Sequence, residues 1–412
     1  MRLLRNRRSA ARLRAVWAAL LALGMSGAAC AAGSGDDAAT KAGAAGGVPV
    51  FEYDPTWPKL PLPNEWIFGE VGGVGVDAGG HIWVIQRPWT VTGRELGAVA
   101  GEAACCRAAP PVIEFDQAGA VVQAWPPLQP FQAAPGTPAG QGVQAGRNGE
   151  QLWEAAPGPY GEWGRREHTV IVDHEDQVWV SNDDSHVVYK FTRDGRHLLT
   201  IGSPGVTRGS NDPDHLGRPA GLAVDPESNE LFVADGYTNK RVIVFDAETG
   251  KYLRHWGAYG KRPEDGDLGP YDPAAPPAQQ FRGPVHGIVI SRDGIVYVTD
   301  RSGNRVQAFR RSGEFVREGF VARETTDLGS AYGVALSQDP EQRWIYVNDG
   351  SNNRIWILRR EDLEVVGSFS SYGRQGGQVL SAHSIAVDQQ GNLYVGETRG
   401  RRVQRFKLVS GG

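Results

Sequence analysis

The fold can be predicted from one stretch of the sequence, Pro284-Val-His286-Gly-Ile-Val-Ile-Ser-Arg-Asp-Gly-Ile-Val-Tyr-Val-Thr-Asp300. An apolar run follows a proline, turns at Asp293-Gly294 and returns as a second apolar run. Asp-Gly between two runs of β-branched and aromatic residues is typical of a β-hairpin. The stretch is therefore predicted to be two antiparallel strands, with a histidine at the start of the first.

The same strand types recur six times along the chain, which indicates an internal repeat. The first strand recurs at 73–77, 169–173, 221–225, 287–291, 333–337 and 384–388. The second, with an aromatic residue and then Val near its centre in every copy, recurs at 82–86, 178–182, 231–235, 296–300, 345–349 and 393–397. A third follows at 112–115, 187–191, 241–245, 305–309, 354–358 and 402–406.

Four short antiparallel strands per unit, with no helical pattern between units, are the signature of a β-propeller blade. A fourth strand is visible in five units, and the sixth unit ends after three. The missing outer strand is expected to come from Val48 to Trp57, which would close the ring and hide its edges. We therefore predict an all-β, six-bladed propeller over residues 48–412, closed by an N-terminal strand.

Composition fits this fold. The chain has 412 residues, is 40% hydrophobic and 22% charged, and carries a formal charge of -4. It is long enough for a large core, and nothing in the charge balance points to nucleic acid. The high content of glycine (55) and proline (26) suits short strands joined by turns.

Residues 1–30 have the layout of an export signal, with a basic start, an apolar run and small residues before Cys30. Cys30 stands where a bacterial lipoprotein carries its acylated cysteine. Lipid anchoring there and simple cleavage near Ala29 or Ala32 are both open. Residues 31–47 are predicted to be a flexible tether. We expect an exported protein, periplasmic or extracellular, whose contact with a membrane would be a lipid on Cys30.

The predicted loops are unequal on the two faces of the ring. Turns between first and second strands and between third and fourth strands are tight, whereas the other face carries the long segments 88–110, 126–167, 203–218 and 258–283. Long loops gathered on one face are expected where a scaffold builds a binding site, although tolerated insertions are the alternative. Within them, Cys105 and Cys106 form either a small disulfide ring or two loop thiols.

The residue that precedes each first strand forms a column around the propeller axis: Gly72, His168, Ala220, His286, Tyr332 and His383. The histidines fall in alternate blades, an arrangement that chance would give about one time in ten. Blades two apart in a ring of six are related by a third of a turn, so the three imidazoles can converge on the axis. Three neutral imidazoles with an open fourth position suit catalytic zinc, and also copper, iron or nickel. The alternative is three separate core histidines.

Residues just after the second strands reach the same face. Arg87 in blade one and Arg301 in blade four would place cations beside the metal, which favours an anionic substrate such as a carboxylate. Tyr237 in blade three could act as a base if a divalent metal lowers its pKa. Packing at the blade edge is the alternative for Arg87 and Tyr237.

These motifs resemble a known family. The repeats look like NHL-type blades, and the set Glu167-His168-Thr-Val, Asp235-Gly-Tyr-Thr-Asn-Lys-Arg241, Pro284-Val-His286 and Ala382-His383-Ser-Ile is similar to peptidyl-α-hydroxyglycine α-amidating lyase (peptidylamidoglycolate lyase). The resemblance covers nearly the whole ring. It implies a lyase that splits a carbinolamide C–N bond into an amide and glyoxylate.

The resemblance also implies residue roles. Zinc would be held by His168, His286 and His383, Tyr237 would be the general base, and Arg87 would contact the substrate carboxylate. Arg301 occupies another matching position for substrate binding. The family carries a structural calcium held partly by an aspartate after the third histidine. Ser384 stands there in this chain, which leaves a structural Ca²⁺ doubtful.

Other functions stay open. A propeller hydrolase of the lactonase type is one, although such enzymes usually hold calcium with acidic and amide side chains. A non-enzymatic NHL-repeat scaffold that binds a protein or glycan on the long-loop face is another. The leading prediction is an exported, metal-dependent monomeric lyase acting on a small-molecule or peptide-derived carboxylate substrate.

Overall fold

The computed structural model describes residues 47–411 apart from residue 92 and segments 101–102, 126–142, 146–150 and 154–165. The predicted export signal, Cys30, nearly all of the tether and most of the 126–167 loop lie outside the described residues. Within the described ranges, no helix is both long and apolar enough to cross a membrane.

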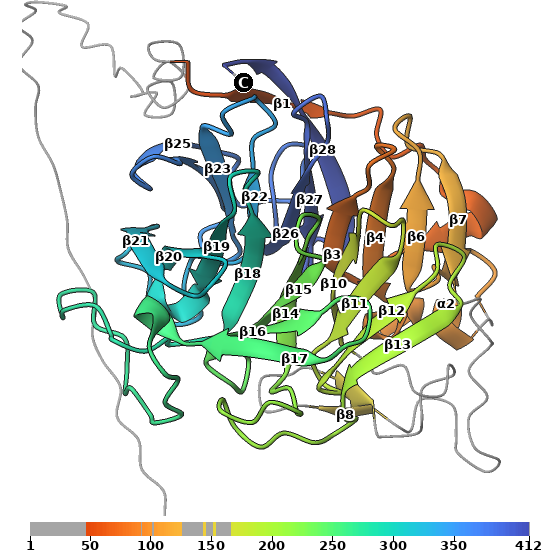
Figure 1. Ribbon diagram of the computed structural model, residues 1–412. Helices are drawn as coiled ribbons and strands as arrows, with labels where there is room; N and C mark the ends of the chain where they lie inside the picture. Colours follow the sequence, from red (N-terminus) through yellow and green to blue (C-terminus); the bar gives the residue numbers. More distant parts are fainter. Residues whose placement is uncertain are drawn as a thin grey trace, which may run out of the picture.

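Six four-stranded antiparallel sheets are arranged as blades around a central axis, which confirms the predicted six-bladed all-β propeller (Figure 1). The innermost strands are β3 (Glu70–Val76), β10 (Glu167–Val172), β14 (Pro219–Asp225), β18 (Val285–Ile290), β22 (Val334–Leu336) and β26 (Ala382–Val387). The second strands are β4 (Ile82–Arg87), β11 (Val178–Asn182), β15 (Glu230–Asp235), β19 (Ile295–Asp300), β23 (Trp344–Asp349) and β27 (Leu393–Glu397).

The outer half of each blade is equally regular. The third strands are β6 (Val112–Phe115), β12 (Val187–Phe191), β16 (Arg241–Asp246), β20 (Arg305–Arg310), β24 (Arg354–Arg359) and β28 (Arg402–Ser410). The outermost strands are β7 (Val121–Trp125), β13 (His197–Gly202), β17 (Tyr252–Trp256), β21 (Phe315–Phe320), β25 (Val365–Phe369) and β1 (Val50–Asp54).

The repeated second strand forms the core because it is buried on both faces between neighbouring blades. All residues of β4 and β11 are buried. In the first two blades, the aspartate after the innermost strand accepts a hydrogen bond from a buried tryptophan on the second strand. Trp83 Nε1 donates to Asp77 Oδ2 at 3.0 Å, and Trp179 Nε1 donates to Asp173 Oδ2 at 2.7 Å. The pairing satisfies the one polar atom of a large aromatic side chain, so the aromatic residue can fill the core without an unpaired donor.

The Asp293-Gly294 turn forms as predicted. Gly294 has a φ of 79°, a left-handed conformation that glycine adopts at little cost, and its N–H donates to Ser291 O at 2.8 Å. The turn reverses the chain between β18 and β19 and so brings Val289 opposite Tyr297.

The ring is closed by β1, which pairs antiparallel with β28 in the sixth blade, as predicted (Figure 1). Asp54 at the end of β1 lies against Arg405 on β28, whose Nε donates to Asp54 Oδ2 at 2.7 Å, and Lys407 Nζ lies 3.1 Å from the same oxygen. Burial alone would raise the pKa of Asp54, but hydrogen bonds from Thr56, Arg405 and Lys407 outweigh it and hold that pKa far below its usual value.

We expect Asp54→Asn to lower the free energy of unfolding by about 2 kcal/mol at pH 7, since charge-assisted hydrogen bonds at the closing strand are lost. A carboxyl whose pKa is lowered by folding stabilises the protein above its unfolded pKa, about 3.9, and loses that contribution as the pH falls through the folded value. The gap between wild type and variant should therefore be constant from pH 7 to about 5 and shrink below about 4.

Denaturant unfolding at several pH values measures this gap. Asp362→Asn is the matched control, because Asp362 pairs with Arg359 at an exposed site and should change stability by less than about 0.5 kcal/mol. An Asp54→Asn protein as stable as wild type at pH 7 would show that the β1 contact does not hold the ring closed.

Several small elements on the loops were not predicted. They are η2 (Pro63–Glu65), η3 (Pro88–Thr90), η4 (Gly93–Glu95), α2 (Leu96–Ala100), η5 (Ala258–Gly260), η6 (Arg301–Gly303), the parallel pair β2 (Trp66–Ile67) and β5 (Arg107–Ala108), and the hairpin of β8 (Val143–Ala145) and β9 (Gln151–Trp153). They are too short to carry a periodic sequence signal. In the same region Cys105 and Cys106 are joined by a disulfide, which is the first of the two predicted alternatives.

Candidate metal centre

The structure brings the three histidines of the predicted column together on the axis. His168, His286 and His383 lie at or near the starts of β10, β18 and β26, and their ring centroids are 4.6 to 4.8 Å apart. The Nε2 atoms of His168 and His286 are 3.2 Å apart. One ring nitrogen from each histidine lies within 4.8 Å of the other two, a spacing at which all three can reach one ion.

The imidazoles are held neutral, as metal binding requires. All three are buried, with 2%, 2% and 6% of their surface exposed. Burial, followed by the charge of neighbouring histidines, lowers the pKa of His168 and of His286 well below the usual range. Burial, followed by the charge of Arg87, lowers the pKa of His383 to about 3. Protons therefore compete little with a cation for these nitrogens at neutral pH.

His383 also has a fixed tautomer. Its Nδ1 lies 2.7 Å from the carbonyl oxygen of Gly72, which can only accept, so Nδ1 carries the proton and Nε2 keeps its lone pair. A backbone carbonyl that orients an imidazole in this way is a common outer-shell feature of metal-binding histidines. The donor set therefore fits zinc or another imidazole-binding transition metal.

The residues fit calcium less well. Ser384, which follows the third histidine, offers a hydroxyl in place of a carboxylate, and its Oγ is buried with no hydrogen-bond partner in the described chain. Calcium sites usually combine several oxygens with at least one carboxylate. That this chain lacks the family's structural calcium site therefore stays a prediction.

Tyr237 follows β15 in the third blade and reaches the histidines. Its hydroxyl oxygen lies 3.2 Å from His168 Nε2 and 3.1 Å from His286 Nε2. Burial raises the pKa of Tyr237, and the positive charge of Arg301 opposes that rise. A proton acceptor placed here would act on a group bound at the histidines.

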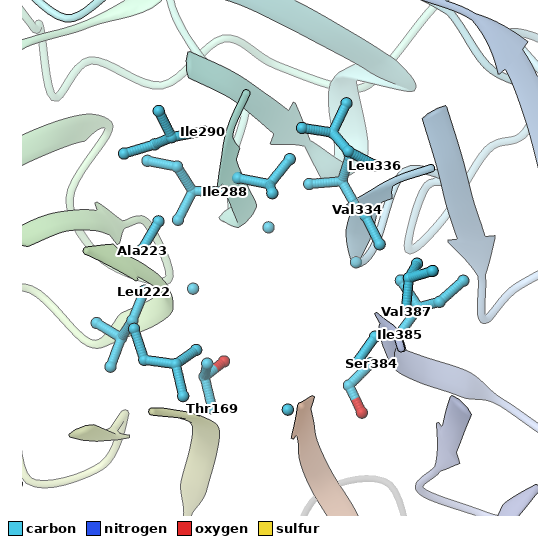
Figure 2. Close-up of a pocket in the computed structure, with 18 of the residues that line it drawn as sticks. Thr169, Leu222, Ala223, Ile288, Ile290, Val334, Leu336, Ser384, Ile385 and Val387 are labelled. Atoms are coloured by element: carbon cyan, nitrogen blue, oxygen red, sulfur yellow. The ribbon is translucent and has the colours of Figure 1, made fainter. Parts of the chain in front are cut away.

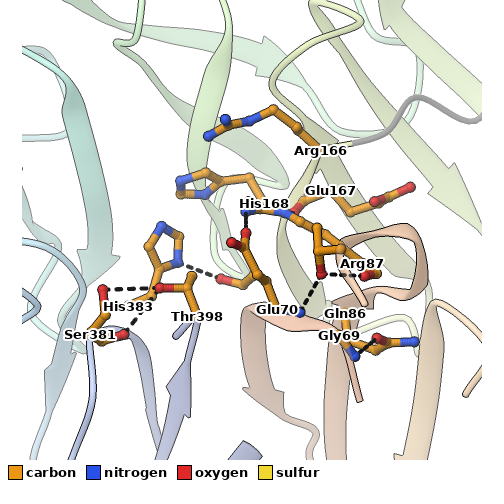
Figure 3. A network of polar contacts seen from close by, with 12 residues as sticks. Gly69, Glu70, Gln86, Arg87, Arg166, Glu167, His168, Ser381, His383 and Thr398 are labelled. Atoms are coloured by element: carbon orange, nitrogen blue, oxygen red, sulfur yellow. Dashed lines mark hydrogen bonds and ion pairs between the residues drawn. The ribbon is translucent and has the colours of Figure 1, made fainter. Parts of the chain in front are cut away.

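Arg87 ends β4 in the first blade and is 3% exposed. Its Nε donates to Glu167 O at 2.9 Å, and its Nη1 donates to Glu70 Oε2 at 2.9 Å (Figure 3). Its Nη2 is buried and has no partner among the described residues. An unpaired, buried guanidinium nitrogen is costly unless a ligand completes it, so Arg87 is suited to an anion.

Arg301 follows β19 in the fourth blade. Its Nη1 donates to the hydroxyl oxygen of Tyr237 at 3.3 Å, and its Nε donates to Leu328 O at 3.0 Å. The guanidinium also lies over the ring of Tyr332, 4.8 Å from its centroid. The structure thus places Tyr237 and Arg301 together beside the histidine cluster.

Three polar residues at this mouth were missed in the sequence. They are Arg166, Asp183 and Arg218, and Figure 3 shows Arg166 beside His168. Asp183 directly follows β11 in blade two, at the position in its blade that corresponds to Arg87 in blade one. The repeat alignment therefore carries a signal for Asp183.

The acids at the other strand exits serve the blades themselves. Asp235 accepts from Arg241 Nε at 2.9 Å, Asp300 accepts from Arg305 Nε at 2.9 Å, and Glu397 accepts from Leu380 N at 2.7 Å. These three acids therefore have a structural role, and their carboxylates are paired within the protein.

Beyond the histidines the axis continues as a cavity of about 450 Å³. Its wall is formed by the innermost strands and is mostly apolar, with Leu222, Ile288, Val334 and Ile385 among the side chains that line it (Figure 2). The histidine cluster lies at one end of the cavity. Arg87, Tyr237 and Arg301 do not line this cavity, and we call the end of the axis where they lie beside the cluster the mouth of the site.

A second cluster of metal-type side chains is occupied by an arginine. Asp77, His81 and Glu114 offer ligand atoms within 4.8 Å of one another. Arg193 Nη2 lies 2.7 Å from Asp77 Oδ2 and also contacts Glu114 and His81. The guanidinium already supplies the positive charge, so we assign no metal there.

Comparisons with known proteins agree with the fold and with the resemblance. Residues 216–245 match the NHL repeat family model. The chain is 28% identical over 248 residues to peptidyl-glycine alpha-amidating monooxygenase B of Xenopus laevis, a match that covers 58% of this chain and 26% of that protein. Peptidyl-glycine alpha-amidating monooxygenase of Mus musculus is 24% identical, and the match covers 23% of that protein. The chain thus spans about a quarter of the length of these two relatives.

Two further relatives match over most of this chain. Peptidyl-alpha-hydroxyglycine alpha-amidating lyase 1 of Drosophila melanogaster is 24% identical over 369 residues, which are 79% of this chain and 60% of that protein. NHL repeat-containing protein 3 of Mus musculus is 24% identical over 367 residues, which are 87% of this chain and 84% of that protein. The chain is therefore a six-bladed propeller in which one segment, residues 216–245, matches the NHL repeat. More particularly, it resembles the amidating lyases at modest identity.

Proposed function

We propose that the protein is a metal-dependent lyase that cleaves the C–N bond of an N-acyl-α-hydroxyglycine to give an amide and glyoxylate. The observation that carries the proposal is the meeting of three buried histidines and one tyrosine hydroxyl on the axis, with the buried, half-paired Arg87 hydrogen-bonded to the residue that precedes His168. Relatives named as amidating lyases support the same reaction. We also propose that the protein is exported to the periplasm or the extracellular space.

His168, His286 and His383 would hold zinc, which supplies Lewis-acid polarisation of the substrate hydroxyl and makes its proton easier to remove. Tyr237, within 3.2 Å of two of those ligands, would take that proton in its anionic form, which the charges of the ion and of Arg301 would favour against the effect of burial. Arg87 would bind the carboxylate through its unpaired Nη2, and Arg301 would stabilise the anionic form of Tyr237 beside it.

The reaction balances without a redox partner. The hydroxyl proton leaves to Tyr237, the oxygen lone pair forms the C=O bond of glyoxylate, and the C–N bond breaks with its electron pair on nitrogen. The nitrogen then takes a proton, which Tyr237 can return, and the amide is complete. The site holds the acid–base group and the anion partner that these steps need.

Arg87→Gln is expected to lower kcat/KM for glyoxylate release by about 10- to 100-fold, mainly through KM, because one or two charge-assisted hydrogen bonds to the carboxylate are lost. Steady-state assays of glyoxylate with an α-hydroxyglycine peptide measure the effect. Arg87→Lys, which keeps the charge, should recover part of the loss. An unchanged KM in Arg87→Gln would remove Arg87 from the substrate site.

A scaffold that binds a protein or glycan is the second candidate. It is favoured by the match to NHL repeat-containing protein 3, whose name carries no enzymatic activity and which covers 87% of this chain. The glyoxylate assay separates the two. A zinc-loaded protein that releases no glyoxylate from any α-hydroxyglycine substrate would favour the scaffold.

A further inference from the structure

The mouth of the site carries a repeated position that no role above uses. The residues two before the axial column are Glu70, Arg166, Arg218, Pro284, Ser330 and Ser381. Arginine occupies this position only in the second and third blades, which are neighbours. The positive charge is therefore concentrated on one side of the opening.

Both arginines are held by one carboxylate. Arg166 Nε lies 3.1 Å from Asp183 Oδ1, and Arg218 Nη2 lies 3.2 Å from the same oxygen. The side chain of Asp183 is fully buried, whereas those of Arg166 and Arg218 are 41% and 33% exposed. Each guanidinium has five N–H donors, and among the described residues only one donor of each arginine, Arg166 Nε and Arg218 Nη2, is used by Asp183.

The pair lies next to the proposed reaction centre. The guanidinium of Arg218 lies over the ring of Tyr237, 5.1 Å from its centroid, and the N–H of Tyr237 donates to Arg218 O at 3.2 Å. Arg166 is two residues before His168 and influences the pKa of both His168 and Tyr237 through its charge. Arg218 therefore contacts the proposed base, and Arg166 lies two residues from one of the proposed metal ligands.

The local charge exceeds what one substrate carboxylate needs. Four arginines surround the mouth (Arg87, Arg166, Arg218 and Arg301). The carboxylates in contact with them are Glu70, Asp183 and Asp184, of which Asp184 accepts from the backbone N–H of Arg166. A divalent cation on the histidines would add two more positive charges. The substrate carboxylate accounts for Arg87 and the anionic form of Tyr237 accounts for Arg301, whereas Arg166 and Arg218 are matched by no group of the ligand.

We propose that Arg166 and Arg218, positioned by Asp183, form a second anion subsite that binds a carboxylate on the acyl side of the substrate. The inference rests on the proposed function and deepens it. Its substrate class is the N-acyl-α-hydroxyglycines with an acidic residue next to the hydroxyglycine. Bidentate guanidinium donors suit a carboxylate there better than a neutral amide.

The test compares two ligands that cannot react, N-acetyl-Glu-Gly and N-acetyl-Gln-Gly, by calorimetry with the zinc-loaded full chain. Wild type is expected to bind the Glu ligand about 10-fold or more tightly than the Gln ligand, and added salt should narrow the difference. Arg166→Gln and Arg218→Gln should each reduce this preference for the Glu ligand, while the affinity for the Gln ligand should change little. Equal affinity for the two ligands in wild type, or no binding of either, would overturn the proposal.

Controls separate charge recognition from loss of fold. Arg218→Lys keeps the charge and should retain part of the preference, whereas Asp183→Asn should weaken it because both arginines lose their anchor. Arg317→Gln, at an exposed position on β21, should leave it unchanged. Circular dichroism checks that each variant is folded. If a variant unfolds, the wild-type comparison of the two ligands still decides the outcome.

Turnover of the matching hydroxyglycine ligands keeps this inference distinct from the proposed reaction. Release of glyoxylate from both ligands with equal kcat/KM would contradict the second subsite and leave the lyase proposal intact. No release from either, together with a clear binding preference for the Glu ligand, would contradict the lyase proposal and leave the subsite intact.

Discussion

His286→Ala is expected to abolish both metal binding and glyoxylate release. The variant removes one of three nitrogens from a site in which all ligand atoms lie within 4.8 Å of one another. Loss of a direct ligand should cost more than the 10- to 100-fold in metal affinity typical of an outer-shell partner, so we expect a drop of more than about 100-fold. Activity should fall by at least about 1000-fold, because the polarisation of the substrate hydroxyl is lost with the metal. Zinc titration and the glyoxylate assay measure the two effects.

His174→Ala is the matched control. His174 is an exposed histidine in the turn between β10 and β11, and its replacement should change neither quantity. Thermal unfolding shows whether each variant keeps the propeller. A folded His286→Ala protein that retains zinc with wild-type affinity would contradict the assignment of His286 as a ligand.

Tyr237→Phe is expected to separate chemistry from metal binding. The substitution deletes one oxygen atom that lies 3.1 Å and 3.2 Å from two histidine nitrogens and leaves the ring between its neighbours. A positioned acid–base group contributes typically 100- to 10,000-fold, so kcat should fall by about 1000-fold. Zinc affinity should stay within a few fold of wild type, because the three imidazoles remain.

Kinetics and zinc titration on the same preparation test this separation. Tyr332→Phe provides a tyrosine control. Its ring lies 5.4 Å from that of His286, and its hydroxyl contacts Ser351 Oγ at 3.3 Å. This variant should keep most of the activity. A Tyr237→Phe protein with near wild-type kcat would show that another group takes the proton.

The histidine cluster could be predicted from sequence because the repeat supplies the geometry. Equivalent positions in a propeller lie at the same height around the axis, so an alignment of the six strands is also a map of the channel. The same logic predicted β1 as the closing strand and placed Arg87, Tyr237 and Arg301 at the mouth. Residues at equivalent positions in the repeats can therefore be predicted to lie close together on the axis.

Contacts that break the symmetry could not be predicted in this way. The hydrogen bond from His383 Nδ1 to Gly72 O joins residues 311 positions apart and depends on how the sixth blade meets the first. The sharing of Asp183 by Arg166 and Arg218 requires side chains from two blades to turn toward one another. Short elements such as α2 are set by loop packing and have too few residues for a periodic signal.

The metal centre is tested by the metal content of the purified wild-type protein after equilibration with zinc and removal of free ion. We expect one tightly bound zinc per chain, lost in His168→Ala at the same time as glyoxylate release. A folded wild-type protein that binds no zinc or other transition metal would show that His168, His286 and His383 do not form a metal centre.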